Sequence, residues 1–241
     1  MKLYVYCLLE GIDEMNGPVR GISGAPVRLQ ALENLGVLVS DFDADAVPVT
    51  RENAMTHAAV VRSVLDRTTP LPFRFGTLVT EQQLRSYISA RKPALETNLA
   101  LVRGCVEMSM KIIWPVSKEA SKEREESTEP DQGAGATFLA AKRREILGSE
   151  LRSAQANEIS TWLHESISGL TRDEKVTIQS SERLFLAAAH LVERPNLQRY
   201  REKMSAAREA RPELHFLLSG PWPPYSFANI ELEFKTQFGV S

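Results

Sequence analysis

A polar and charged segment, Ser117–Ala136, divides the chain of 241 residues into two halves. It contains one proline, two glycines and few large apolar side chains. Such a segment buries too little apolar surface to offset the conformational entropy that ordering it would remove. A chain of this length also exceeds the usual size of one domain. We therefore expect an N-terminal domain at 1–116, a flexible linker at 117–136, and a C-terminal domain with a terminal strand or tail at 137–241.

Several apolar patterns in the N-terminal half predict β-strands. Both faces of Leu3–Leu9 are apolar, as in a central strand that is covered on both sides. Residues 27–32 and 37–42 predict two short strands that form a hairpin. Residues 71–79 predict a short strand that stops at a glycine, and the alternation of Val106–Trp114 predicts a strand with one face toward a core.

Two helices are expected between these strands. After Thr50, apolar residues recur at steps of three and four and form the stripe of an amphipathic helix that ends near Thr68. Thr80 and Gln83 have the spacing of a capping box, which starts a second helix running toward residue 103. Pro93 is expected to kink or split this second helix.

The C-terminal half predicts a similar mixture of helices and strands. One long amphipathic helix is expected at 137–167 and another from Pro195 to about Pro212. Strands are expected at 175–179, 183–192, 214–219 and 230–238, although the alanine content of 183–192 also allows a helix. The fold class is therefore α+β, with two domains that each have helices packed on a small, mainly antiparallel sheet.

Charge and cysteine content exclude several classes of function. The chain has 29 basic and 31 acidic residues, a formal net charge of −2, so we expect no nucleic-acid partner. Cys7 and Cys105 are too few for a disulfide framework or a four-cysteine zinc site and indicate a reducing compartment. The short apolar run at the N-terminus precedes acidic residues and does not resemble a signal peptide. No apolar run approaches the ~20 residues that span a bilayer, so we expect a cytoplasmic protein without a membrane partner.

The titratable residues suggest no catalytic site, metal site or cofactor. The histidines lack metal-ligand spacing, and no serine lies in a nucleophile-elbow motif. His57 is expected to be a packed, hydrogen-bonded residue, with a titrating switch as the alternative. Arg74 is expected to pair with an internal acid such as Glu107, with the binding of a ligand carboxylate as the alternative.

The stretch "SGPWPPYSF", Ser219–Phe227, combines stiff and large side chains. Gly220 permits a turn that is closed to other residues, and the three prolines fix φ and remove amide donors, so this loop should resist strand pairing. Trp222, Tyr225 and Phe227 could anchor a partner, or Trp222 and Phe227 could pack between the two domains. We favour packing, because aromatic side chains are more often buried than displayed.

Five segments together resemble one known family. "HAAVVRSVL", "LPFRFGTLV", "GCVEMSMKI", "AAAHLVER" and "SGPWPPYSF" occur in the order and spacing of the gas vesicle protein F/L family (GvpF/GvpL), and the resemblance covers nearly the whole chain. The sequence departs from the family pattern at His190, where a tyrosine is expected, and at Met108, where many members carry tryptophan. The positions that match the family motifs, and to which we assign structural roles, are Pro72, Arg74, Gly76, Glu107, Gly220, Trp222, Pro223, Pro224, Tyr225 and Phe227.

The resemblance implies a two-domain α+β fold that is ferredoxin-like in part. It also implies a cytoplasmic accessory protein that is a minor component of gas vesicles. Such a protein would bind the small hydrophobic gas vesicle shell protein A during vesicle nucleation and prevent its aggregation. Other gas vesicle accessory proteins are further expected partners.

Two surfaces are candidates for binding the shell protein. One is the first-domain sheet through Tyr4, Tyr6 and Leu8, which we prefer, and the other is the C-terminal strand through Ile230, Leu232 and Phe234. A rival hypothesis is an enzyme that binds a ligand in a cleft between the domains, near Arg74, His57 and Tyr225. A third is a purely structural component of the vesicle shell.

Overall fold

The chain forms two compact units in the computed structural model. Unit 1 comprises Met1–Glu107 together with Pro221–Ser241, and unit 2 comprises Met108–Gly220. The expected linker at 117–136 and the two boundaries around it lie outside the described residues. The described residues are 1–11, 14, 15, 17–113, 142, 150, 153–179 and 185–230.

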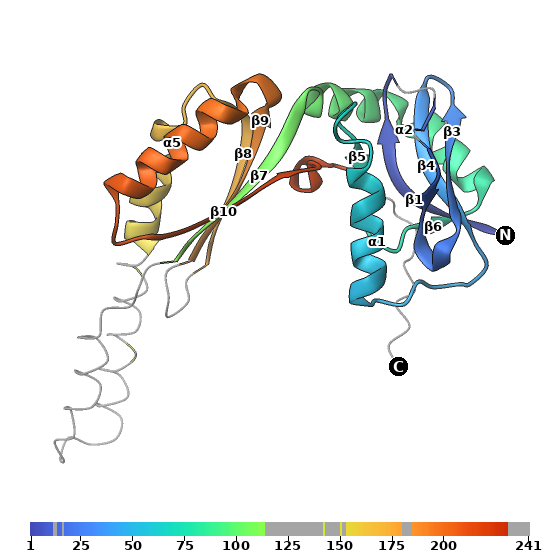
Figure 1. Ribbon diagram of the computed structural model, residues 1–241, viewed down its shortest axis with the longest axis horizontal. Helices are drawn as coiled ribbons and strands as arrows, with labels where there is room; N and C mark the ends of the chain where they lie inside the picture. The colour runs from blue at the N-terminus through green and yellow to red at the C-terminus, as the bar shows by residue number, and fades with distance from the viewer. Residues whose placement is uncertain are drawn as a thin grey trace, which may run out of the picture. The chain divides into compact units, whose positions relative to one another are not determined.

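Unit 1 is built on an antiparallel sheet with two helices (Figure 1). The strand order is β2-β3-β4-β1-β5, and β6 also pairs with β1. The strands are β1 (Lys2–Leu9), β2 (Val19–Arg20), β3 (Pro26–Leu32), β4 (Leu35–Phe42), β5 (Leu71–Pro72) and β6 (Leu78–Val79), and the helices are α1 (Arg51–Arg62) and α2 (Glu81–Val102).

The central strand and the hairpin are confirmed. β1 pairs with β4 on one side and with β5 and β6 on the other, so it lies inside the sheet. β3 and β4 form the expected hairpin, closed by the pair Leu32 and Leu35. The expected strand at 71–79 is instead two short strands, because a turn with Gly76 at φ +84° separates them.

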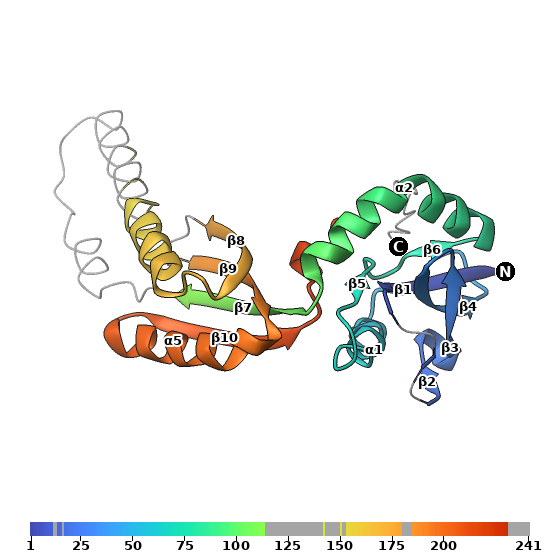
Figure 2. The same ribbon diagram turned by 90° about the horizontal axis from the view of Figure 1, so that it is seen from above.

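Side chains begin both helices of unit 1 as the sequence predicts. The Thr50 hydroxyl accepts a hydrogen bond from the Asn53 amide at the start of α1, at 3.1 Å. Thr80 and Gln83 form the full capping box of α2. Pro93 lies inside α2 without dividing it into two helices, and Figure 2 shows the axis of this helix bending along its length.

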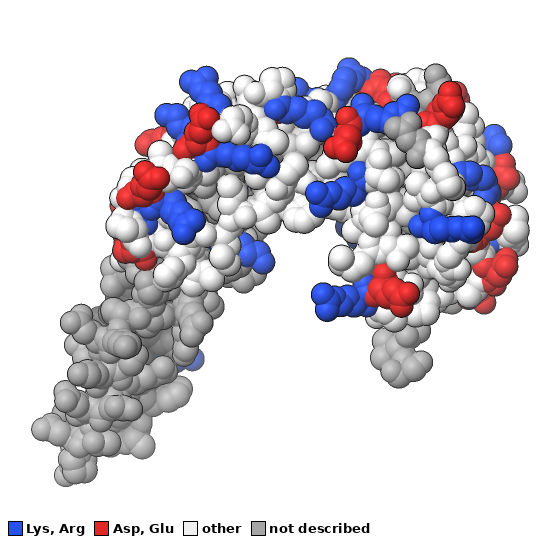
Figure 3. Space-filling view, viewed as in Figure 1, with Lys and Arg blue, Asp and Glu red and all other residues white. Residues whose placement is uncertain are grey.

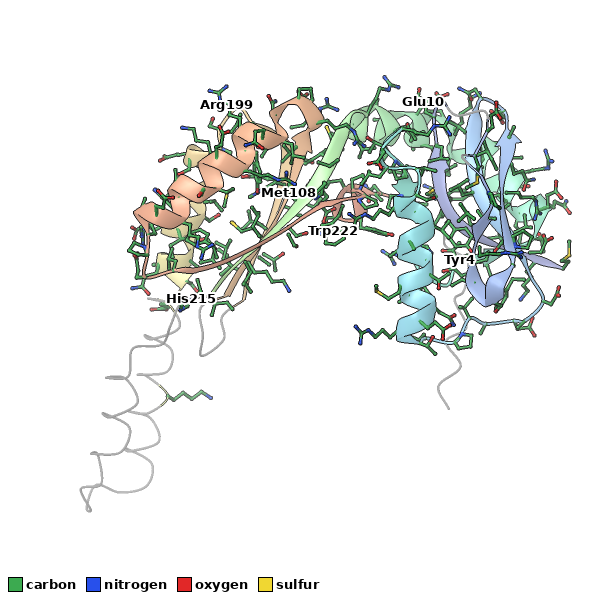
Figure 4. All side chains as sticks on the ribbon, in the orientation of Figure 1. Tyr4, Glu10, Met108, Arg199, His215 and Trp222 are labelled. Carbon is green, nitrogen blue, oxygen red and sulfur yellow. The ribbon has the colours of Figure 1, made fainter. Side chains whose placement is uncertain are left out.

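The core of unit 1 lies between the sheet and α1. Tyr4, Tyr6 and Leu9 of β1 are fully buried there and pack with Val60 and Val61 of α1. Figure 4 shows Tyr4 in the layer between β1 and α1. The tyrosine rings therefore belong to the interior of unit 1.

Unit 2 has the element order and sheet order of a ferredoxin-like fold (Figure 1). Residues 153–166 are helical and lie in the chain between β7 and β8. The strands lie in the order β10-β7-β9-β8, so the first and third strands of the set are neighbours. The other elements are β7 (Cys105–Ile113), β8 (Thr171–Gln179), β9 (Phe185–Glu193), α5 (Leu197–Ala210) and β10 (His215–Trp222).

Packing explains why β7 belongs to this second sheet, although we expected it to complete the first domain. Met108, Met110 and Ile112 are buried in the core of unit 2, where they pack with apolar side chains of residues 153–166 and α5. Alternation identified the buried face of this strand but not the core that the face joins.

Two ambiguous segments of the C-terminal half are strands. Residues 185–193 form β9, which pairs with β8 over its length, so the strand interpretation of 183–192 is confirmed within the described residues. β10 continues through Pro221 to Trp222, which corrects the expectation that the prolines prevent strand pairing here. An edge strand accepts a proline, because the missing amide faces away from its only neighbour.

Most of the expected helix at 137–152, and the expected C-terminal strand beyond Ile230, lie outside the described residues. Within the described residues, no helix combines the length and the apolar character needed to cross a membrane. Acidic and basic side chains are interspersed over the face shown in Figure 3, which agrees with the near-neutral net charge.

Candidate functional site

The proline-rich and aromatic stretch begins in the last residues of β10 and continues into a tight corner. Gly220 has φ +123°, a value that other residues rarely adopt. The chain then turns through a short 3-10 helix, η3 (Tyr225–Phe227), in which the amides of Tyr225 and Phe227 donate to the carbonyls of Pro223 and Pro224. We call residues 220–227 the aromatic corner. Its backbone is restrained by both the prolines and these hydrogen bonds.

A buried carboxylate holds the aromatic corner in unit 1. Glu107 is 5% exposed, and its two oxygens accept hydrogen bonds from the Ser226 amide at 2.7 Å and the Ser226 hydroxyl at 2.8 Å. Hydrogen bonds to a charged group are stronger than neutral ones, and they offset the cost of burying it. Phe227 is 2% exposed beside this contact. Glu107, at the start of β7, is thus joined to the aromatic corner within unit 1.

Asn98 of α2 holds the backbone after the corner. In the orientation that satisfies its hydrogen bonds, its amide nitrogen donates to the Phe227 carbonyl at 3.1 Å. Its oxygen accepts from the Asn229 amide at 3.0 Å. Neither Ser226 nor Asn98 was identified from the sequence, because single hydroxyl and amide side chains carry no pattern that indicates such distant contacts.

The other two aromatic residues of the corner remain partly exposed. Trp222 is 38% exposed, and the guanidinium of Arg62 lies 5.3 Å from the centre of its ring, within cation–π range. Tyr225 is 40% exposed, and its ring centre lies 6.4 Å from that of His57. Trp222 and Tyr225 thus lie beside α1 (Figure 4 labels Trp222) and present ring surface to solvent.

His57 is a buried structural residue. It is 3% exposed, and its Nδ1 lies 2.9 Å from the Tyr4 hydroxyl, which also accepts a hydrogen bond from the Gly76 amide. Burial lowers the pKa of His57 to about 4, so the ring is neutral at pH 7. A buried neutral imidazole is neither a switch near neutral pH nor a base that a ligand can reach.

Arg74 does not form the pair that we expected with Glu107. Its side chain is exposed on the turn between β5 and β6, while Ser226 occupies the Glu107 carboxylate. Arg74 is absent from the salt bridges among the described residues. Pro72 is buried in β5, opposite Cys7 of β1, and Gly76 supplies the positive φ of the turn.

Those proposed partner-binding residues that the structure describes are buried. Tyr4, Tyr6 and Leu8 are fully buried, so in this state of the protein they cannot contact a partner. Ile230 is also buried, at 5% exposure. Leu232 and Phe234 lie outside the described residues. The apolar character of both faces of β1 indicated this burial, since a strand covered on both sides has no free face.

The three residues of the enzyme hypothesis all belong to unit 1. Arg74 is exposed, Tyr225 is partly exposed, and His57 is inaccessible. Within the described part of the chain, no group of three or more His, Cys, Asp or Glu side chains is arranged to hold a metal ion. Of the three, His57 and Tyr225 are in ring contact, and Arg74 and Tyr225 are accessible to solvent.

Comparison with known proteins identifies the family. Residues 2–229 match the family model described as gas vesicle synthesis protein GvpL/GvpF. The chain is 27% identical to gas vesicle protein L2 of Halobacterium salinarum, over 93% of this chain and 90% of that protein. It is also 27% identical to gas vesicle protein L of a Streptomyces species, over 95% of this chain and 94% of that protein.

Solved structures show the same fold. The crystal structure of gas vesicle protein GvpF from Anabaena sp. PCC7120 superposes with a TM-score of 0.77, at 19% identity, over 96% of this chain and 99% of that one. GvpF from Microcystis aeruginosa superposes with a TM-score of 0.75, at 18% identity, over 95% of this chain and 99% of that one. Because the family model matches almost the whole sequence, the chain belongs to the GvpL/GvpF family of gas vesicle proteins.

Proposed function

We propose that this protein is a gas vesicle accessory protein that binds the small hydrophobic shell protein, gas vesicle shell protein A, during vesicle nucleation and prevents its aggregation. The observation that carries the proposal is the family match over residues 2–229. The relatives are named as gas vesicle proteins and not as enzymes, which favours binding over catalysis.

The physical requirement for such a protein is clear. A shell protein that is apolar enough to line a gas space would aggregate in water unless its apolar surface were temporarily covered. An accessory protein covers that surface by offering apolar side chains of its own while remaining soluble. Exposed apolar side chains such as Met55, Trp222 and Leu217 suit this activity. We place the protein in the cytoplasm and, as a minor component, in the gas vesicle.

Co-expression with the shell protein tests this proposal. The affinity-tagged full chain should increase the fraction of shell protein that remains soluble and should recover it on the affinity resin. An unrelated tagged protein of similar size, expressed to the same level, is the control. If the shell protein is equally insoluble with both and is recovered with neither, the binding function is wrong.

Purified vesicles distinguish a transient assembly factor from a permanent part of the shell. We expect urea or detergent washing to remove most of the protein from intact vesicles, because a minor accessory component is held by surface contacts. Quantitative immunoblotting of the washed vesicles gives the measurement. Full retention would favour the purely structural hypothesis.

A further inference from the structure

The two edges of the unit 2 sheet differ in their chemistry. In the strand order β10-β7-β9-β8, the edge strands are β10 and β8 (Figure 2). β8 carries the consecutive charged residues Arg172, Asp173, Glu174 and Lys175, whereas β10 contains no Asp, Glu, Lys or Arg. Charged side chains are a common means of preventing an edge strand from pairing with another chain. β8 is therefore protected in this way and β10 is not.

The middle of β10 has the exposure of a strand that lacks a neighbour. Leu217 is 56% exposed and Leu218 is 38% exposed. Successive side chains of a strand point to opposite faces of the sheet, so apolar surface is exposed on both faces at this edge. Phe216, on the same face as Leu218, packs against the core of unit 2. β10 is thus held in the sheet, while no strand of the described residues pairs with its outer edge.

A second copy of this chain has an edge that is complementary to β10. It presents the same strand without charged residues, so no like charges are brought opposite each other when the two edges meet. Homodimers are most often related by a twofold axis, and two antiparallel edge strands related by such an axis form one continuous sheet. This pairing covers the exposed leucines of both copies at once.

Symmetry limits the register of this pairing. A twofold axis perpendicular to the sheet keeps every side chain on its own face, so the axis lies at a residue that is opposite its own counterpart. With the axis at Leu217, the two Leu217 side chains are opposite each other and Phe216 is opposite Leu218. An axis at Phe216 places Leu217 opposite His215, and an axis at Leu218 places it opposite Ser219. Of these three registers, the first matches apolar residues with apolar residues in the middle of the strand.

The same register avoids the irregular end of β10. It places Pro221, which has no amide hydrogen, opposite Glu213, which precedes the strand. Gly220, with φ +123°, falls opposite Leu214, which also precedes the strand. The ladder therefore comprises residues 215–219 of both copies, and none of these is a proline.

We propose that the protein forms a homodimer in which β10 of each copy pairs antiparallel with β10 of the other, centred on Leu217. The two sheets of unit 2 then join into one continuous sheet. A single short ladder buries a small area, so we expect a weak dimer that depends on concentration. This inference is independent of the proposed function, because it concerns this chain alone.

Sedimentation equilibrium of the purified full chain measures the dimer. Between about 1 μM and about 1 mM, which covers weak dissociation constants, the mean mass should rise from that of one chain toward that of two. Leu217→Glu places two like charges opposite each other at the axis and should weaken the dimer at least about tenfold. Val176→Glu changes an exposed apolar residue of the other edge strand, β8, and should dimerise as the wild type does. Circular dichroism should show both variants folded.

Cysteine variants test the register. At the axis the two α-carbons are about 4.5–5.5 Å apart, within disulfide range, so Leu217→Cys should form a cross-linked dimer with oxidised glutathione as the oxidant. The two copies of residue 218 are offset by two residues along the strands, about 7 Å, so Leu218→Cys should cross-link much more slowly. The native Cys7 and Cys105 are buried and should not react.

Three outcomes would overturn the inference. A wild type that stays monomeric over the whole concentration range would leave the edge of β10 to an extended segment of a different protein. A dimer that Leu217→Glu does not weaken would have its contact elsewhere on the chain. Faster cross-linking in Leu218→Cys than in Leu217→Cys would contradict the register centred on Leu217. The co-expression test of the proposed function can succeed or fail independently of each of these results.

Discussion

Each unit of the protein buries one histidine against a tyrosine hydroxyl, but the two pairs are built from opposite elements. In unit 1 the tyrosine, Tyr4, lies on strand β1 and the histidine, His57, on helix α1. In unit 2 the histidine, His190, lies on strand β9 and the tyrosine, Tyr200, on helix α5, with 2.7 Å between His190 Nδ1 and the hydroxyl. The same polar contact thus joins a sheet to a helix in both units.

The surroundings of the two pairs differ. The Tyr4 hydroxyl also accepts from the Gly76 amide, so it connects β1, α1 and the turn before β6. The rings of Tyr6 and Phe75 lie within 6 Å of the His57 ring, at 5.7 Å and 5.9 Å. The contact between His190 and Tyr200 connects β9 with α5. A pair that joins three segments should contribute more to stability than a pair that joins two.

Acid should affect both pairs alike and gives the largest expected effect. Burial lowers the pKa of His57 to about 4, and burial together with the nearby His164 lowers the pKa of His190 to about 4. An unfolded histidine has a pKa of about 6.5, so the unfolded chain binds more protons between these values. Above pH 6.5 both histidines are neutral in the folded and the unfolded chain, and the free energy of unfolding is not reduced. As the pH falls from 6.5 through 4, each histidine lowers the free energy of unfolding by about 3 kcal/mol.

Urea unfolding between pH 7 and pH 4 measures this loss. His57→Gln and His190→Gln should each reduce the pH dependence by a similar amount, because each deletes one of the two histidines whose pKa is lowered. If only one of the two variants showed a smaller pH dependence of unfolding, the expectation that the two histidines contribute alike would be wrong.

Removing the tyrosine hydroxyl should destabilise unit 1 more than unit 2. Tyr4→Phe leaves both the His57 ring nitrogen and the Gly76 amide without their partner, and we expect it to lower the free energy of unfolding by about 2–4 kcal/mol. Tyr200→Phe removes a single contact and should cost about 1–2 kcal/mol. Urea unfolding at pH 7 provides both values. Equal losses would contradict the argument from the number of joined segments.

Glu107 anchors the aromatic corner within unit 1, and we expect the loss of this anchor to lower the free energy of unfolding by an intermediate amount. Glu107→Gln replaces a charged acceptor of two hydrogen bonds by a neutral group, with an expected loss of about 1–2 kcal/mol. Tryptophan fluorescence should report a changed environment of Trp222, since its corner is released. Glu193→Gln in unit 2, which removes an exposed pair with Arg172, is the control and should change stability by less than about 1 kcal/mol.

The smallest expected effect concerns the starts of the helices. Thr80→Ala removes the capping box of α2 in unit 1 and should cost about 1 kcal/mol. The side chain of Asn196 makes no capping hydrogen bond at the start of α5 in unit 2, so Asn196→Ala should cost at most a few tenths of a kcal/mol. Thermal unfolding followed by circular dichroism compares the two, and a larger loss in Asn196→Ala would overturn the assignment of the caps.

Local patterns predicted those parts of the fold that depend on neighbours in the sequence. The two-sided apolar run of β1, the hairpin of β3 and β4 and the Thr80 capping box are all short-range features, and the structure contains each of them. The α+β class is confirmed for the same reason, because it depends on the types of element and not on their pairing.

Contacts between segments that are distant in the sequence could not be predicted from local patterns. Nothing near Glu107 in the sequence indicates that its carboxylate binds Ser226, which lies 119 residues further along the chain. The position of β7 in the second sheet depends on which core its methionines join, and alternation does not specify the core. The contact between Arg62 and Trp222 likewise joins segments that lie far apart in the sequence.

Pro221 has a further consequence for the free edge of β10. An exposed edge strand with leucines is a template for pairing with other extended chains, which leads to aggregation. A protein that binds an aggregation-prone partner is especially exposed to such pairing. A ring nitrogen without a hydrogen offers nothing to an incoming carbonyl, so a growing ladder stops at that position. The proline that stiffens the corner thereby also limits how far an added strand can extend.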